Sequence, residues 1–154
     1  MRRTLALRRS ALETILAHAR AVHPEECCGA VVSRGDRDEV MRFTNIQGRL
    51  HQGSPGAHPR DATRAYAPEP RELLAAVRAG DEPGARLAVF YHSHTVRGAY
   101  FSGEDRARAM FGDEPAYPEV AYLVVSDART SGEARAFGWD EGARDFVELE
   151  LAIT

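Results

Sequence analysis

The sequence predicts a mixed α/β fold in which helices flank a central mixed β-sheet. Segments with the 3.6-residue periodicity of amphipathic helices alternate with short segments that are apolar throughout or at every second residue, as strands are. The expected order along the chain is roughly β-α-β-β-α-β-α-β-β-β. The 154 residues are 44% hydrophobic, and neither a repeat nor a linker divides them, so we expect one domain over residues 1–154.

The first helix is expected between a short strand at residues 4–7 and Pro24. Ser10 and Glu13 have the spacing of a capping box, in which the serine caps the helix and the glutamate reaches back to it. Apolar residues then recur at helical spacing as far as Val22. Because proline breaks a helix, we expect the helix to stop before Pro24.

A β-hairpin and a long loop are expected next. The segments 30–33 and 39–44 flank an Arg-Gly-Asp-Arg sequence at 34–37, which is typical of a hairpin turn. Residues 47–63 are polar, rich in glycine, proline and histidine, and show no periodicity. We expect a loop there, and loops of this length are often functional.

The second half is expected to contain two helices and four strands. Pro70 has the position of an N1 proline at the start of a helix that ends at Gly80. A short, uniformly apolar segment at 87–91 is typical of a buried central strand. Ser102 can cap a third helix, with Asp105 in its first turn. The remaining strands are expected at 120–126, 134–139 and 145–151.

Composition excludes several partners and chemistries. The net charge is −3 and no basic block occurs, so we expect neither nucleic acid nor a membrane as a partner. All 20 basic residues are arginine, which excludes covalent catalysis by lysine. The two cysteines, Cys27 and Cys28, are adjacent and form no disulfide framework, and the N-terminus lacks the apolar run of a signal peptide. We therefore expect a cytoplasmic protein.

The most specific motif is His92-x-His94-x7-Ser102-x2-Asp105. The two histidines follow the apolar strand at positions i and i+2, so their side chains point to the same side. Two imidazoles, one carboxylate and an open fourth position suit a catalytic zinc ion. A His-Ser-His triplet alone is also common on protein surfaces, but the four-residue pattern is far more specific. The sequence therefore indicates a metal hydrolase.

Peptide hydrolysis at such a site also needs a carboxylate near the metal but not bound to it. A zinc ion with three protein ligands lowers the pKa of its water from about 16 toward about 7, and the carboxylate carries the proton to the leaving amine. The candidates are Glu25 and Glu26, which we expect at the end of the first helix, before a core strand. From composition alone, two glutamates that simply face water are an alternative, and the downstream metal motif favours catalysis.

These residues together resemble a known family. The four-residue motif, preceded by Pro24-x-Glu26-x-Cys28-Gly29, is similar to that of the JAMM, or MPN-plus, metalloproteases, and the similarity covers nearly the whole chain. The chain most resembles compact bacterial members such as the CysO-cysteine peptidase. The resemblance implies a JAB-like mixed sheet flanked by helices, with an architecture similar to that of cytidine deaminases. Further similar positions are Asn45, Tyr66-x-Pro68 and residues 117–126.

The resemblance also implies roles for particular residues. It implies that His92, His94 and Asp105 bind one Zn²⁺ ion. Glu26 matches the general base that shares the metal-bound water, and Ser102 matches the serine that stabilises the tetrahedral oxyanion. A helix-capping role for Ser102 can coexist with that function.

Neighbouring residues are expected to have other roles. Ser93 points away from the ligands by strand alternation, and the resemblance implies that Cys28 is a packed neighbour of the site rather than a nucleophile. Thr95 stands where many relatives have proline, and the loop at 96–101 is unusual; these departures concern substrate choice rather than ligand number. Arg97 either meets a substrate carboxylate or is exposed, and exposure is the commoner state of such arginines.

The family implies a zinc-dependent peptidase or isopeptidase that cleaves after a C-terminal Gly-Gly of a ubiquitin-like or sulfur-carrier protein. Release of a cysteine, maturation of a precursor and deconjugation are all left open, as is a homodimer. The extended tail can dock at a sheet edge by strand addition. The alternative is a non-catalytic scaffold or binding module on the same fold. A phosphoesterase would need more His and Asp ligands, and the H-x-E and P-C-x-x-C motifs of cytidine deaminases are absent.

Overall fold

The computed structural model describes residues 2–126 and 133–154 and confirms the mixed α/β fold. The main strands are β1 (Thr4–Leu7), β2 (Cys28–Arg34), β3 (Arg37–Phe43), β4 (Arg86–His94), β7 (Ala121–Ser126), β8 (Ala134–Asp140) and β9 (Asp145–Ile153). A separate short hairpin consists of β5 (Met110–Phe111) and β6 (Glu114–Pro115). The helices are α1 (Arg9–Val22), α2 (Gln47–Gly53), α3 (Pro70–Gly80) and α4 (Gly103–Ala109).

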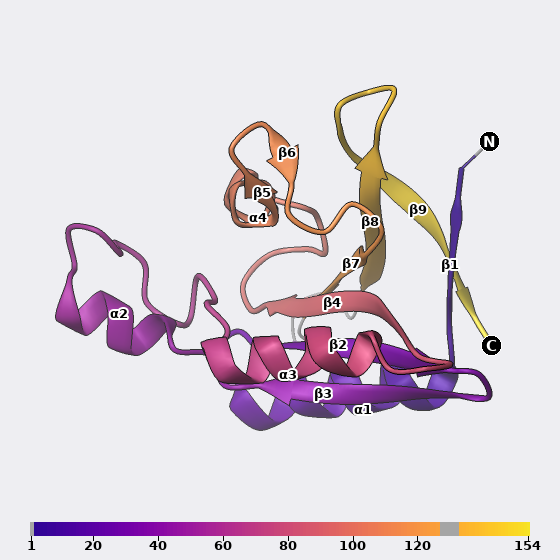
Figure 1. Cartoon of the computed structure of the whole chain (residues 1–154). Helices are drawn as coiled ribbons and strands as arrows, with labels where there is room; N and C mark the ends of the chain where they lie inside the picture. Colours follow the sequence, from indigo (N-terminus) through magenta and orange to yellow (C-terminus); the bar gives the residue numbers. More distant parts are fainter. Residues whose placement is uncertain (1, 127–132) are drawn as a thin grey trace.

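The seven main strands form one sheet in the order β1-β9-β8-β7-β4-β2-β3. β1 pairs with β9 and β4 pairs with β7 in parallel, and the other neighbours are antiparallel. In Figure 1, β4, β2 and β3 run across the view while β8 and β9 run up it, so the sheet is strongly curled. The prediction of a mixed sheet flanked by helices is confirmed.

The two faces of the sheet have separate cores, and this separation places the candidate site. Residues of α1 pack against one face, and residues of α3 against the other (Figure 1). Along β4, Val89 and Tyr91 belong to the core under α1, whereas Phe90 packs under α3. Because strand side chains alternate, His92 and His94 continue the face of Phe90 beyond the end of α3's core.

A predicted helix and the predicted hairpin are confirmed. α3 begins at Pro70 as predicted, and the side chain of Glu69 caps it by accepting a hydrogen bond from the Glu72 N–H at 3.0 Å. The predicted hairpin is also present, with Gly35 in its turn at a φ of 70°. No helix in the described part of the chain combines the length and the apolar character needed to cross a bilayer.

The predicted capping box of Ser10 and Glu13 is wrong. α1 begins at Arg9, and its N-cap residue Arg8 makes no capping hydrogen bond through its side chain. The reason is tertiary: the first helical N–H, that of Arg9, donates to the carbonyl of Thr154 at 2.9 Å. A partner from the other end of the chain thus takes the place of a local cap.

The predicted loop at 47–63 is wrong in its first part, which is the helix α2. Gln47 anchors this helix in the interior, where only 2% of the residue is exposed. Its amide N–H donates to the Arg60 carbonyl and its amide oxygen accepts from Arg108, both at 2.8 Å. Long-range polar contacts hold α2, so no apolar stripe marked it in the sequence. The hairpin β5–β6 was also missed, because two-residue strands carry no periodic signal.

Gly29 is expected to be essential for stability because Tyr91 lies directly over it in the neighbouring strand. The Tyr91 ring is fixed by a hydrogen bond between its hydroxyl and His18 Nδ1 at 2.7 Å, and a Cβ at position 29 would overlap the ring. Gly29→Ala should therefore lower the free energy of unfolding by about 1–3 kcal/mol, measured by chemical denaturation. Gly53→Ala is the control, since a Cβ there meets no atom within 4 Å. Equal stability of the two variants would contradict this packing.

Candidate functional site

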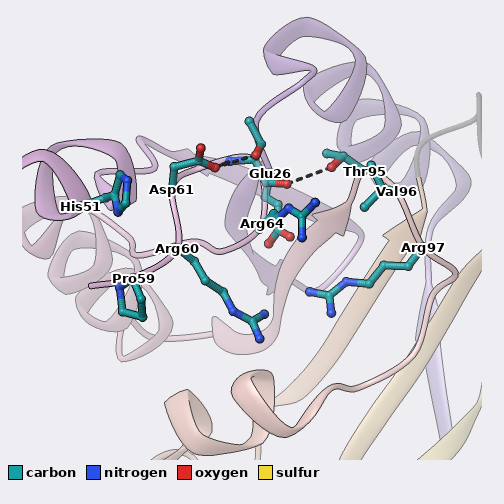
Figure 2. Close-up of a pocket in the computed structure, with 10 residues that line it drawn as sticks. Glu26, His51, Pro59, Arg60, Asp61, Arg64, Thr95, Val96 and Arg97 are labelled. Atoms are coloured by element: carbon teal, nitrogen blue, oxygen red, sulfur yellow. Dashed lines mark hydrogen bonds between the residues drawn. The ribbon is translucent and has the colours of Figure 1, made fainter. Parts of the chain in front are cut away.

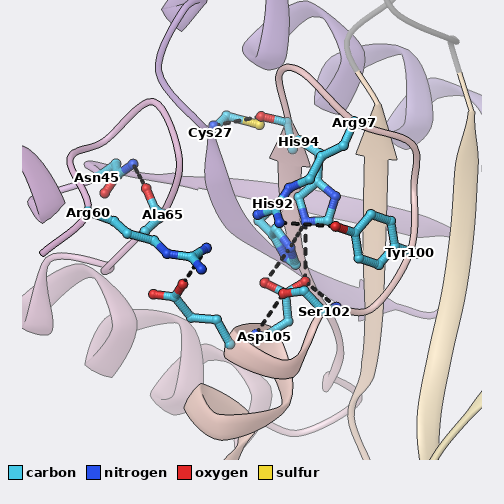
Figure 3. Close-up of polar contacts among 12 residues, drawn as sticks. Cys27, Asn45, Arg60, Ala65, His92, His94, Arg97, Tyr100, Ser102 and Asp105 are labelled. Carbon is cyan, nitrogen blue, oxygen red and sulfur yellow. Dashed lines mark hydrogen bonds and ion pairs between the residues drawn. The ribbon is translucent and has the colours of Figure 1, made fainter.

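Three predicted ligands converge at the carboxyl end of β4. His92 and His94 end the strand and Asp105 lies in the first turn of α4. Their donor atoms form a small triangle: His92 Nε2 lies 3.4 Å from His94 Nε2 and 3.1 Å from Asp105 Oδ1, and His94 Nε2 lies 3.2 Å from Asp105 Oδ2 (Figure 3). All three residues are buried. In the described part of the chain, this is the one cluster of His, Cys, Asp and Glu with such spacing.

The triangle has the dimensions of a zinc site. A tetrahedral ion with ligand distances of about 2.0–2.1 Å separates its ligand atoms by about 3.3 Å, close to the three distances here. The position of the proton on His94 also favours a bound cation. His94 Nδ1 lies 2.9 Å from the Gly98 carbonyl and must carry the proton to bond with it, so a neutral ring turns its Nε2 lone pair toward the Asp105 carboxylate. Two facing lone pairs repel, and a cation between them removes the repulsion.

Contacts beyond the triangle orient the two imidazoles in different ways. The Gly98 carbonyl fixes His94 by accepting from Nδ1, as is usual for metal-bound histidines. His92 Nδ1 is buried and has no hydrogen-bond partner in the structure as described. The His92 ring instead stacks on Tyr66, with ring centroids 4.4 Å apart and an interplanar angle of 22°. The guanidinium of Arg108 lies 5.5 Å from the centroid of the Tyr66 ring.

Asp105 is held in place by a capping box at the start of α4. The Asp105 N–H donates to Ser102 Oγ at 3.0 Å, and the Ser102 N–H donates to Asp105 Oδ2 at 2.9 Å. Burial favours a high pKa for Asp105, but its contacts with His92 and His94 and the hydrogen bond from the Ser102 N–H hold the pKa well below its ordinary value. The carboxylate is therefore ionised at neutral pH, and the cap confirms the predicted capping role of Ser102.

Glu26 directly precedes β2, the strand that pairs with the end of β4. Cys28 pairs with His92, and the next backbone hydrogen bond runs from the Ser93 N–H to the Cys27 carbonyl at 3.1 Å. Continued by one residue, this register puts Glu26 opposite His94 on the same face. Only 2% of Glu26 is exposed, so the interpretation that it simply faces water is wrong. α1 has already ended at Val22, and Glu26 follows it by four residues, directly before β2.

The surroundings of Glu26 fix its backbone and shift its pKa. Its N–H donates to the Ala62 carbonyl at 2.7 Å, and its carbonyl accepts from Asn45 Nδ2 at 3.0 Å. Asn45 also accepts hydrogen bonds from the backbone of Gln47 and Ala67, so it ties three segments together. Burial first, and then the charge of Asp105, raises the pKa of Glu26 to about 8 in the protein without metal.

Glu26 forms part of the lining of a pocket of about 400 Å³ beside the triangle (Figure 2). Thr95 and Arg97, which follow His94, lie on one side of this pocket, and the segment 59–64 lies on the other. Arg97 is half-buried rather than fully exposed. Glu26 can therefore exchange protons with a molecule that enters the pocket. Together the lining residues are Glu26, His51, Pro59, Arg60, Asp61, Thr63, Arg64, Thr95, Val96 and Arg97.

The cysteines and Ser93 are structural, as expected. Ser93 points away from the triangle, and its Oγ accepts a hydrogen bond from the Cys27 N–H at 2.8 Å. Burial raises the pKa of the Cys27 thiol to about 12 and raises that of Cys28 further. Neither thiol is a nucleophile at neutral pH, since the thiolate is the reactive form.

Three residues near the site were missed by sequence reasoning. Arg108 had a usable signal, because it follows Asp105 by three positions and therefore lies on the same face of α4. Gly98 and Gln47 had none: the first contributes only a carbonyl, and the second lies in a segment without periodicity.

Comparisons with known proteins agree with the fold. Residues 8–138 match the family described as prokaryotic homologs of the JAB domain. The chain is 29% identical to a desampylase of Haloferax volcanii over 97% of this chain and 96% of the relative. It is 28% identical to the CysO-cysteine peptidase of Mycobacterium bovis over 79% and 73%. The solved structure of a JAB1/MPN domain protein from Archaeoglobus fulgidus is similar with a TM-score of 0.54, 17% identity and coverage of 99% and 97%.

The raised pKa of Glu26 predicts how stability depends on pH. Without metal, the unfolded chain loses this proton near 4.5 and the folded protein near 8, so the folded state binds more protons between these values and stability falls as pH rises. Glu26→Gln removes this loss. The free energy of unfolding of the variant relative to the wild type should rise from pH 4.5 to 8 by more than about 1 kcal/mol, measured by denaturation in chelator. The exposed neighbour provides the control Glu25→Gln, and a difference independent of pH would contradict the shift.

Proposed function

The chain belongs to the prokaryotic homologs of the JAB domain, and on that premise we propose that it is a zinc-dependent metallopeptidase or isopeptidase. Its substrate is the bond after a C-terminal Gly-Gly of a small ubiquitin-like or sulfur-carrier protein. The observation that carries this proposal is the buried triangle of His92, His94 and Asp105 with Glu26 opposite His94. The names of the two relatives, a desampylase and a CysO-cysteine peptidase, agree with it.

In this proposal His92 and His94 would hold the zinc ion through Nε2, and Asp105 would hold it through its carboxylate. Such an ion would supply a Lewis acid, which polarises a carbonyl group and lowers the pKa of water. The chain supplies the rest of the site: the capping box of α4 holds the carboxylate, and the Gly98 carbonyl fixes the proton of His94 on Nδ1.

Glu26 acts as the general base and acid. It takes a proton from the attacking water and delivers it to the nitrogen of the leaving amine. Its burial, and its place on the face that carries the ligands, keep the carboxyl group beside the reacting atoms. A cation on that face opposes the pKa shift caused by burial and Asp105, and brings the pKa back toward the value that suits proton transfer near pH 7.

Ser102 stabilises the oxyanion of the tetrahedral intermediate. Its Oγ accepts from the Asp105 N–H, so its own proton remains available for donation. A donor of this kind is worth about 2.7–4 kcal/mol of transition-state stabilisation where it has been measured in other hydrolases.

A non-catalytic scaffold is the rival function, and a specific observation argues against it. A scaffold has no need for three ionisable side chains buried with their donor atoms about 3 Å apart, because such burial costs free energy unless a cation is bound. The experiments below separate the two functions directly.

Metal binding tests the ligands. Purified protein should contain about one zinc per chain, and Asp105→Asn should lower the affinity by more than the roughly 10–100-fold typical of a lost supporting contact. Competition with a chelator and elemental analysis measure this. Asp145→Asn is the control, since Asp145 is exposed and contacts Arg106 at 2.7 Å and the N–H of Phe146 at 2.8 Å, away from the triangle. Zinc should also raise the melting temperature of the wild type and of this control, but not that of Asp105→Asn. Equal zinc affinity of all three proteins would remove the basis of the proposal.

Hydrolysis tests Glu26. Carriers ending in Gly-Gly-X should be shortened to Gly-Gly in a reaction that chelator stops and zinc restores, followed by mass spectrometry. Glu26→Gln should bind zinc normally and lower kcat by about 10²–10⁴-fold, whereas Glu25→Gln should leave kcat unchanged. Full activity of Glu26→Gln would show that another group moves the proton.

A further inference from the structure

The pocket beside Glu26 is rich in arginine. Three of its lining side chains are guanidinium groups, those of Arg60, Arg64 and Arg97. Figure 2 shows Arg60 and Arg97 extending from opposite walls toward the middle of the pocket. Since arginine is the side chain best suited to grip a planar carboxylate, this lining favours an anionic ligand.

Acidic groups around the pocket neutralise only part of the charge of these arginines. Arg60 forms an ion pair with Glu104 at 2.8 Å. The carboxylate of Asp61 is used in a turn, where it accepts hydrogen bonds from the N–H and the hydroxyl of Thr63. Within residues 2–126 and 133–154, neither Arg64 nor Arg97 forms an ion pair. The charge of Asp61 acts on Arg64, so the guanidinium of Arg97 is the more available of the two for a ligand.

Arg97 is fixed relative to the candidate metal site. Its own carbonyl accepts a hydrogen bond from Ser126 Oγ at 3.3 Å, and the carbonyl of the next residue, Gly98, holds Nδ1 of the ligand His94. Its guanidinium donates to the Tyr100 hydroxyl at 3.0 Å and lies 5.5 Å from the centroid of that ring. The charge of Arg97 acts directly on Glu26, whose pKa it lowers against the effect of burial.

The position of these arginines beside Glu26 decides which part of a substrate they can bind. Glu26 delivers its proton to the leaving amine, so the leaving group must occupy the pocket that Glu26 lines. In an amino acid, the carboxyl carbon lies only about 2.5 Å from the nitrogen, while each further residue adds about 3.3–3.6 Å. Arg64 and Arg97 line the same pocket as Glu26, so a guanidinium there can meet the carboxylate of a leaving group that is a single residue.

We propose that Arg97, supported by Arg64, binds the terminal carboxylate of the leaving residue, and that the enzyme therefore releases single amino acids from the C-terminus of its carrier. This inference rests on the proposed function and narrows its substrate class. The C–N bond after Gly-Gly breaks, and the oxygen of water joins the glycine carbonyl carbon. Both protons of the water pass to the nitrogen. The products are therefore a carrier that ends in a carboxylate and a free amino acid with an ammonium group. A lysine side-chain amine in an isopeptide has no carboxylate at this distance and is a poorer leaving group in this pocket.

The experiment compares two forms of one β-grasp carrier that ends in Gly-Gly-Ala, one with a free carboxylate and one with a carboxamide. Binding of both is measured by titration calorimetry to zinc-loaded Glu26→Gln, in which hydrolysis is suppressed. The acid should bind at least about tenfold more tightly than the amide, as expected for a charge-assisted hydrogen bond. Adding Arg97→Gln should remove this preference without weakening binding of the amide. Arg71→Gln, on the exposed surface of α3, is the matched control and should keep the preference.

The outcomes distinguish a failure of the carboxylate site from a failure of the proposed peptidase activity. Equal binding of acid and amide, or a preference that survives Arg97→Gln, would overturn the carboxylate site even if the wild type hydrolyses both forms. A preference that depends on Arg97, with no hydrolysis of either form by the wild type, would support the carboxylate site and overturn the proposed peptidase. With active wild type, the same preference should be seen mainly in KM, since the carboxylate contact is made in the ground state.

Discussion

Three electron-rich atoms buried about 3 Å apart are the constraint on which the rest of the structure depends. Two neutral imidazoles and a carboxylate that turn their lone pairs toward one another in a dry interior repel unless a cation lies between them. The fold nevertheless holds the three side chains in this arrangement. The groups that hold them also serve the architecture: the end of a central strand, a capped helix terminus, and a loop carbonyl.

The same contacts therefore have two functions. The capping box of Ser102 and Asp105 starts α4 and also aims a carboxylate at the two histidines. The stack of Tyr66 on His92 fills the core and also sets the plane of an imidazole whose Nδ1 finds no hydrogen-bond partner within the described residues. A substitution at either position affects stability and the candidate metal site together, which is why the proposed experiments measure zinc binding and unfolding separately.

The two sides of the site differ in chemical character. On the side of Glu26 the pocket is polar, and three arginines are among its lining residues. On the side of Cys28 and Tyr66 the lining is mainly aromatic and apolar, with Phe90 and Tyr122 among its residues. Under the proposed function, a peptide that crosses the triangle would meet an apolar surface at one end and an arginine-rich one at the other.

Much of the fold and of the candidate site could be predicted from the sequence because the relevant signals are local. The spacing of His92, His94, Ser102 and Asp105 follows from the two-residue repeat of a strand and the first turn of a helix, so the triangle was predictable once β4 and α4 were assigned. The strand predicted at residues 30–33 likewise lies within β2, which begins two residues earlier, at Cys28. The alternation of β4 even predicted that Ser93 would point away.

Tertiary structure decided what depends on long-range partners. The sequence could not show that Thr154 caps the start of α1, that Gln47 anchors a helix in a polar segment, or that Glu26 is buried opposite His94, because each needs a partner distant in the chain. The arginine-lined pocket also depends on residues distant in the chain, since Arg60 and Arg64 come from one segment and Arg97 from another. Local patterns determine which residues can share a face, whereas strand register and long-range hydrogen bonds determine which faces meet.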